Sequence, residues 1–327
     1  MDSIPKISII LPVFNSKTRI SQCLETLINQ TLHDIEIVVV LDCPNDGTDK
    51  IVLNYAKKDK RIIVIQNKEQ MHIGNSRNIG LQSAHGEYIG FSDHDDFREL
   101  TMYECLYKAA KENDSDIVFS PCRHISLKKD KIVQHNSFDF SAQHDLQKYC
   151  LSDLIGNGNN EREESLFINI QGCIYRNEFI KKHHIHFVDT RTITPEDIIF
   201  QIDTFSKTTH ICIQNDFLYT HVSHSSNEGI KSSYKNIRKR CKGLNYIHAN
   251  LPDNMYKENF YIYVQKQFLH LLAATIFPFP NIVKFLSYRK ILRSYEFCIP
   301  AFKGNNLRHT KKGIKQLFRH FLCFSLR

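Results

Sequence analysis

Three carboxylates lie close together in the segment Asp93-His94-Asp95-Asp96, directly after the apolar run 88–91. Two such charges about 4 Å apart repel one another by on the order of 4 kcal/mol at the dielectric of a protein surface. A divalent cation would offset this repulsion, and oxygen ligands suit Mg²⁺ or Mn²⁺ bound together with a diphosphate. The alternative is a solvated acidic turn in which Asp96 caps the next helix. Because the segment follows a strand, the metal site is favoured.

A pair of carboxylates follows a proline in a second segment, Thr194-Pro195-Glu196-Asp197, just before the apolar run 198–200. A proline at the start and acidic residues in the first turn are typical of a helix N-terminus. Helix formation alone therefore accounts for these residues, and the pattern by itself assigns them no catalytic role.

The elements that must position these side chains are short apolar runs alternating with amphipathic stretches. The runs 7–11, 35–41, 62–65, 88–91 and 117–119 read as buried strands, and helical spacing of apolar residues lies between them. This alternation predicts an α/β fold with a mostly parallel sheet covered by helices on both faces. Ligands bind such sheets beyond the carboxyl ends of the strands, where the acidic segment lies.

Charge divides the chain unevenly. Residues 231–327 contain 19 Lys/Arg and 3 Asp/Glu, a balance of +16, whereas residues 1–230 have a balance of −8. The pattern after residue 232 is helical, and the last 25 residues read as a basic amphipathic helix. We expect this tail to contact an anionic surface such as a membrane; a packed, solvated helix is the alternative.

Several classes of protein are disfavoured by the same sequence. The ten cysteines have no CxxC spacing, which predicts reduced thiols and neither a zinc ribbon nor a disulfide framework. No secretory signal is recognised at the start, and no apolar run reaches the roughly 20 residues of a membrane span. We therefore expect a cytoplasmic protein, peripheral at the inner face of the cell membrane if the tail binds lipid.

Four motifs in order resemble the inverting glycosyltransferases of family 2, which have the GT-A fold. Residues 9–15 (IILPVFN) are similar to the opening strand of that family, and Asp42 follows the second strand as the base-binding aspartate does. Residues 74–80 (GNSRNIG) are similar to its helix start, and residues 86–96 (GEYIGFSDHDD) to the strand that leads into its D-x-D-D motif. Each motif alone is weak; their order makes the resemblance specific.

The resemblance implies roles for the residues that bind the donor nucleotide. Pro12 and Phe14 would line the base and ribose, and Asp42 would accept a hydrogen bond from uracil N3–H. An acceptor-only carboxylate suits the imide of uracil, although thymine would pass the same test. Arg77 would lie near the donor, with a surface ion pair as the alternative, and Asp93 would bind ribose or sugar hydroxyls.

It also implies the metal ligand and the catalytic pair. Asp95 would hold Mn²⁺ or Mg²⁺ against the donor phosphates, where the cation acts as a Lewis acid for the departing diphosphate. Asp197 would be the general base that takes the proton of the acceptor hydroxyl, and Glu196 would support it. His221 and His224 are candidate contacts to the diphosphate; structural histidines are the alternative.

These expectations combine into one hypothesis. Residues 1–226 would form the GT-A domain, with a nucleotide-binding half over about 1–125 and an acceptor half over about 126–226, followed by a basic helical region over 227–327. The enzyme would transfer a single sugar from a nucleotide diphosphate donor, with UDP favoured, to a saccharide or lipid-linked acceptor in surface polysaccharide biosynthesis.

The resemblance has gaps, and one rival hypothesis remains. The usual acidic run after the second strand is here Asp42-Cys43-Pro44-Asn45-Asp46, and the absence of tryptophan excludes the Q-x-x-R-W motif of processive polymerases. The rival is an inactive GT-A-like scaffold or nucleic-acid-binding protein that uses the basic tail. No RNA-binding motif with paired aromatics occurs, so we expect no nucleic acid as partner.

Overall fold

The computed structural model describes residues 4–126, 131–133, 146–147, 150–151, 169–223 and 233–250. Its centre is a seven-stranded sheet in the order β10-β6-β9-β4-β1-β2-β3. Its strands are β1 (Ile7–Val13), β2 (Ile35–Leu41), β3 (Ile62–Gln66), β4 (Tyr88–Phe91), β6 (Ile117–Phe119), β9 (Cys173–Arg176) and β10 (Ile211–Ile213). Neighbouring strands are parallel except β9, which runs antiparallel to both β4 and β6.

A smaller sheet has the order β5-β11-β7-β8. Its strands are β5 (Phe97–Arg98), β7 (Cys122–Ser126), β8 (Lys131–Val133) and β11 (Tyr219–Ser223). Because β5 comes directly after the acidic segment and pairs with β11, residues 92–96 connect the two sheets. The acidic segment is therefore held at both ends by strands.

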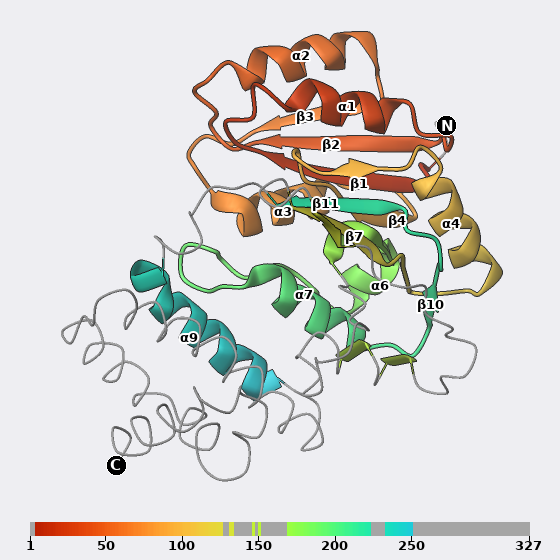
Figure 1. Cartoon of the computed structure of the whole chain (residues 1–327), viewed down its shortest axis with the longest axis vertical. Helices are drawn as coiled ribbons and strands as arrows, with labels where there is room; N and C mark the ends of the chain where they lie inside the picture. Colours follow the sequence, from red (N-terminus) through yellow and green to blue (C-terminus); the bar gives the residue numbers. More distant parts are fainter. Residues whose placement is uncertain are drawn as a thin grey trace.

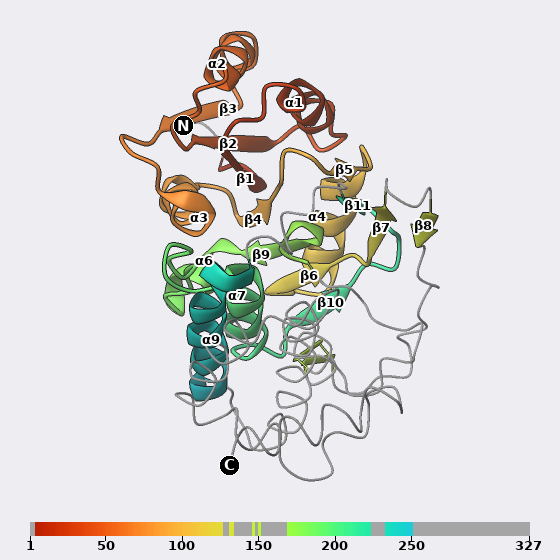
Figure 2. The same cartoon turned by 60° about the vertical axis from the view of Figure 1, so that its left-hand side comes forward.

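Helices cover both faces of the large sheet, as Figures 1 and 2 show. On one face lie α1 (Ile20–Ile28), α2 (Thr48–Lys58) and α4 (Met102–Glu112). On the other face lie α3 (His72–Ser83), α6 (Asn177–Lys182), α7 (Glu196–Phe205) and α9 (Ser233–Asn250). The described part also contains a short 3₁₀ turn, η2 (Ile170–Gly172), before β9.

The continuous apolar runs are explained by burial on both faces. Every residue of β1 and β2 is buried. Within β1, Ile9 and Leu11 pack with α1 and α4, whereas Ile10 packs into the cluster on the opposite face. A strand covered on both sides can carry apolar residues without alternation, which is the pattern that predicted a parallel sheet.

The predicted α/β class and its mostly parallel sheet are confirmed. The sequence pattern missed two details: α3 begins at His72, before the motif 74–80 that resembles a helix start, and β9 inserts antiparallel between β4 and β6. The antiparallel strand depends on a pairing between distant parts of the chain, which no local period encodes.

Helix α9 begins beyond the proposed boundary at residue 226, and that division remains a prediction. Its side chains Cys241, Leu244 and Ile247 are buried in the same cluster as α7 and the sheet. No helix in the described part of the chain is both long and apolar enough to cross a bilayer. The expected amphipathic helix in the last 25 residues lies outside the described residues.

Candidate active site

The carboxyl ends of β1, β2 and β4 meet at one edge of the large sheet. Val13 pairs with Leu41, and the amide of Asp42 donates to the carbonyl of Val13 over 2.9 Å. Phe91 pairs with Ile10, so the acidic segment begins beside the same edge. Strand order thus brings together residues that lie about 80 positions apart in the chain.

Asp42 is buried and ties β2 to the start of α3. Its carboxylate accepts hydrogen bonds from Asn67 Nδ2 at 2.8 Å and from the backbone amides of Met71 at 2.6 Å and His72 at 2.8 Å. A carboxylate has about four acceptor positions, so these three bonds leave about one for a further donor. This arrangement fits recognition of a single imide N–H.

Phe14 and Pro12 differ in what they offer to a base. Phe14 stands at the end of β1 with 42% of its surface exposed, which makes its ring available for stacking. Pro12 is buried within β1, opposite Val40, so it can only support the base from the strand side. Phe14 is the first residue after β1, at a bend of the chain, so its ring lies beyond the strand end.

Arg77 connects the acidic segment to the start of α7. Because the residue is buried, the alternative of an ion pair on the surface is wrong. The residue is 2% exposed. Its Nη2 lies 3.1 Å from Asp93 Oδ1, its Nη1 lies 3.1 Å from Glu196 Oε1, and its guanidinium lies over the ring of Phe187. Burial by itself would lower the pKa of Arg77, but the carboxylates of Asp93 and Glu196 raise it, so the side chain stays charged.

Gln171 is a site residue that the sequence did not reveal. Its Nε2 donates to Asp93 Oδ2 over 2.5 Å, so both carboxylate oxygens of Asp93 are hydrogen-bonded. Gln171 lies in η2, which β9 places next to β4. A single glutamine among the mostly apolar residues 166–175 carries no local signal of this contact; only the antiparallel insertion of β9 creates it.

Asp95 and Asp96 serve different purposes although they are adjacent. Asp96 is buried, and its carboxylate accepts hydrogen bonds from Tyr219 Oη at 2.5 Å and from the amide of Val222 at 2.9 Å. Asp96 is therefore not the helix cap considered above, because α4 begins only at Met102. Asp95 remains partly exposed, and its Oδ2 lies 3.5 Å from Arg19 Nη1.

The acidic segment fits a metal only together with phosphate oxygens. Among the described residues, no group of three His, Cys, Asp or Glu side chains is arranged to hold an ion by itself. Both carboxylate oxygens of Asp93 and of Asp96 accept hydrogen bonds from protein donors. Asp95 forms an ion pair with Arg19, and its side chain is the most exposed of the three, at 29% against 23% for Asp93 and 1% for Asp96. One carboxylate plus substrate phosphates is a normal coordination for Mg²⁺, so the residues present fit the expected ion.

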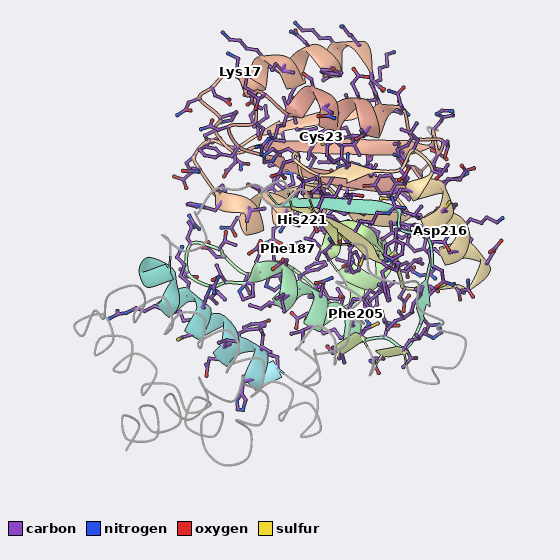
Figure 3. The ribbon with its side chains drawn as sticks, in the orientation of Figure 1. Lys17, Cys23, Phe187, Phe205, Asp216 and His221 are labelled. Atoms are coloured by element: carbon purple, nitrogen blue, oxygen red, sulfur yellow. The ribbon has the colours of Figure 1, made fainter. Side chains whose placement is uncertain are left out.

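His221 lies beside the acidic segment and contacts one of its carboxylates. Its Nδ1 lies 3.1 Å from Asp96 Oδ1. The hydrogen bond with Asp96 raises the pKa of His221, against the opposing effect of burial. Figure 3 labels His221 on β11, with Phe187 between that strand and α7 in this view. His224 lies outside the described residues.

Glu196 and Asp197 open α7, as the helix signal predicted, with Pro195 directly before the first turn. Burial and the neighbouring charge of Asp197 raise the pKa of Glu196, although Arg77 acts in the opposite direction. Asp197 Oδ1 accepts a hydrogen bond from the amide of Ile198 over 2.9 Å, and no other hydrogen bond to Asp197 occurs within the described ranges. The pair thus contains one carboxylate held by Arg77 and one that is less constrained.

Comparisons with known proteins agree on the nature of the chain. A family model described as "Glycosyl transferase family 2" matches residues 8–186. The chain is 29% identical over 318 residues to the uncharacterized glycosyltransferase EpsJ of Bacillus subtilis, covering 94% of this chain and 89% of that protein. It is 27% identical over 286 residues to the cholesterol galactosyltransferase of Borreliella burgdorferi, covering 83% of this chain and 77% of that protein.

A solved structure supports the same fold. Residues 1–349 of TarS from S. aureus, in complex with UDP-GlcNAc, superpose with a TM-score of 0.72 at 18% identity. The match covers 98% of this chain and 88% of the other. The likeness confirms the expected GT-A fold.

Proposed function

Because the chain belongs to glycosyltransferase family 2, we propose that it transfers a single sugar from a UDP-linked donor, with inversion, to a hydroxyl of a saccharide or lipid-linked acceptor. One observation carries this proposal. The guanidinium of Arg77 bridges Asp93, at the donor edge of the sheet, and Glu196, at the start of α7. The bridge keeps Asp197 close to the donor carboxylates, as a direct displacement requires.

The donor base is held at the ends of β1 and β2. Phe14 stacks on the base, and Asp42 uses its remaining acceptor position for uracil N3–H. A base without an imide or amide N–H at that position would leave the buried carboxylate short of a partner, which costs affinity. TarS binds UDP-GlcNAc in its crystal structure, which supports a donor of the same nucleotide for this chain.

Asp197 is the general base. As the acceptor oxygen forms its bond to the anomeric carbon, the hydroxyl proton passes to Asp197 and the bond to the diphosphate breaks on the opposite face. Glu196 suits this role less well, because protonation would break its ion pair with the buried Arg77. Glu196 therefore orients the loop and the guanidinium.

The leaving diphosphate is stabilised at the acidic segment. Asp95 would hold a divalent cation there, which supplies Lewis-acid stabilisation of the departing phosphate oxygens. His221 contributes positive charge, because Asp96 raises its pKa and keeps its ring in place. Asp93, fixed by Arg77 and Gln171, orients the ribose or sugar hydroxyls.

The basic C-terminal part of the chain supports a location at the membrane, where a lipid-linked acceptor would be found. A saccharide or lipid-linked acceptor in surface polysaccharide assembly would meet the enzyme at the cytoplasmic face of the membrane. The basic tail would hold the enzyme there through anionic lipid. Retention on liposomes that contain anionic lipid, compared with a version that ends near residue 303, tests this part separately.

Nucleotide binding and donor hydrolysis test the central proposal. Calorimetry with UDP should show binding that strengthens when Mn²⁺ is added, and CDP should bind more weakly because N3 of cytosine carries no hydrogen to donate to Asp42. A panel of UDP-sugars should contain one that the enzyme slowly hydrolyses without an acceptor. Equal affinity for CDP and UDP would refute the uridine preference; an unreactive panel together with absent nucleotide binding would refute the proposal as a whole.

A further inference from the structure

Helix α9 packs against α7 and the loop that precedes it. Its apolar side chains Cys241 and Leu244 are buried, and Tyr246 Oη lies 3.3 Å from Asp203 Oδ2 on α7. Figure 2 shows α9 running beside α7. The helix is therefore fixed to the element that carries the proposed base.

Gly243 brings the backbone of α9 against the residue before Pro195. A Cβ atom at Gly243 would lie 2.1 Å from the carbonyl oxygen of Thr194 and 2.8 Å from its carbonyl carbon. Contacts below 3.0 Å essentially do not occur for real Cβ atoms. Only glycine allows this approach, and the neighbouring atoms are backbone, which cannot rotate away.

Lys239 contacts the same loop twice. Its carbonyl accepts a hydrogen bond from the amide of Thr194 over 3.3 Å, and its Nζ donates to the carbonyl of Thr190 over 3.0 Å. Lys239 and Gly243 are four residues apart, so they share one face of α9. Each contact acts on the loop that ends at Glu196.

The opposite side of the loop is held by α3, the helix that carries Arg77. A Cβ at Gly74 would lie 2.4 Å from the carbonyl oxygen of Val188. The side chain of Asn78 exchanges two hydrogen bonds of 2.8 Å with the backbone of Phe187. The loop 187–195 is thus clamped between α3 and α9.

We propose that Gly243 is a positioning residue for glycosyl transfer, which sets the place of Asp197 through close contact with Thr194. This inference rests on the proposed role of Asp197 as base. An added methyl group forces Thr194 to move by on the order of 1 Å, and a displacement of that size at a catalytic group can lower turnover about 100-fold. The donors to Asp42 come from Asn67, Met71 and His72, which lie outside both α9 and the loop 187–195, so we expect UDP binding to stay intact.

The test compares Gly243→Ala with Asn245→Ala, an exposed position on the same helix. Affinity is measured with UDP and Mn²⁺, and turnover with the UDP-sugar that the unaltered enzyme hydrolyses. For Gly243→Ala we expect a UDP affinity within twofold of the unaltered enzyme, a KM within threefold and a kcat about 100-fold lower. For Asn245→Ala we expect all three to stay within twofold. A kcat for Gly243→Ala within threefold of the unaltered enzyme overturns the inference.

Hydrogen exchange gives a readout that does not depend on catalysis. The amide of Thr194 should exchange faster in Gly243→Ala, while the amides of Met71 and His72, which donate to Asp42, keep their protection. Loss of protection at both places would indicate general unfolding and overturn the inference. Unchanged protection at Thr194 would also overturn it.

Lys239 supplies a second variant in case Gly243→Ala is poorly folded. Lys239→Met keeps the backbone carbonyl but removes the donor to Thr190, so kcat should fall about fivefold, and Lys239→Arg should restore it because arginine also donates. Equal turnover of all three forms overturns the inference. If Asp197→Asn proves active while Gly243→Ala is impaired and loses protection at Thr194, the base assignment has failed and the positioning of the loop stands.

Discussion

Arg77 and Glu196 are 119 residues apart in the chain, yet Arg77 Nη1 lies 3.1 Å from Glu196 Oε1 in the interior of the molecule. The same guanidinium contacts Asp93. A buried cation between two carboxylates links the donor edge of the sheet to the helix that carries the proposed base. This link makes donor binding and base placement parts of one structural unit.

Replacing Arg77 by Met should destabilise the fold by about 3–5 kcal/mol, because it leaves buried carboxylates without their cation. Urea unfolding of both proteins measures the difference. The matched control is Arg191→Met, which removes an exposed ion pair with Asp189 and should change the unfolding midpoint little. A small effect of Arg77→Met would mean that the bridge to Glu196 contributes little to the fold.

Replacing Asp197 by Asn should lower the rate of donor hydrolysis about 10²–10⁴-fold, because the amide cannot accept the proton. UDP affinity should remain unchanged, since Asp197 makes no contact with the proposed base-binding residues. The control is Asp49→Asn in the first turn of α2, which should be as active as the unaltered enzyme. Full activity of Asp197→Asn would assign the base elsewhere.

Replacing Asp95 by Ala should abolish the increase in UDP affinity that Mn²⁺ produces, because the carboxylate that we propose as the metal ligand is lost. Titration of UDP with Mn²⁺ or with EDTA measures this. His94→Ala is the neighbouring control and should keep the metal effect. If Asp95→Ala still responds to Mn²⁺, another residue holds the ion.

His221 predicts a pH dependence of stability. The pKa of His221 in the folded state is raised above the unfolded value of about 6.5. The stability that His221 contributes is therefore fully present below pH 6.5 and is lost as pH rises through the folded pKa. The pKa of Asp96 shifts in the opposite direction: burial raises it, but His221 and Tyr219 lower it overall. The stability that Asp96 contributes is therefore lost only at acid pH. Urea unfolding of the unaltered protein should therefore show a decline in stability above pH 6.5 that His221→Gln lacks. Parallel curves for the two proteins would contradict this.

Local sequence patterns were enough to predict the main strands and helices and most of the candidate residues. The β-branched runs and helical spacings predicted the parallel strands, because a strand covered on both faces reads as a continuous apolar segment. The end of the run 88–91 pointed to the acidic segment, and the resemblance to family 2 glycosyltransferases singled out Asp42 and the Glu196-Asp197 pair. Each of these signals is contained within a few consecutive residues.

Only the tertiary structure decided how the three carboxylates of the acidic segment differ. Asp93 is bound by Arg77 and Gln171, Asp96 by Tyr219 and its neighbours on β11, and Asp95 remains partly exposed. Adjacent residues of one type look equivalent in sequence. Their roles depend on which distant donors the sheet order brings to each oxygen.

The buried state of Arg77 and the close approach of Gly243 to Thr194 have the same origin. Judged from local sequence, an arginine in a helix is expected to be a charge on the surface. A glycine in a helix is expected to destabilise that helix. Burial and backbone contact arise only when α3, α7 and α9 pack on one face of the sheet. Sequence periodicity encodes which face of a helix is apolar, but contacts between elements that are far apart in the chain are set by how those faces pack together.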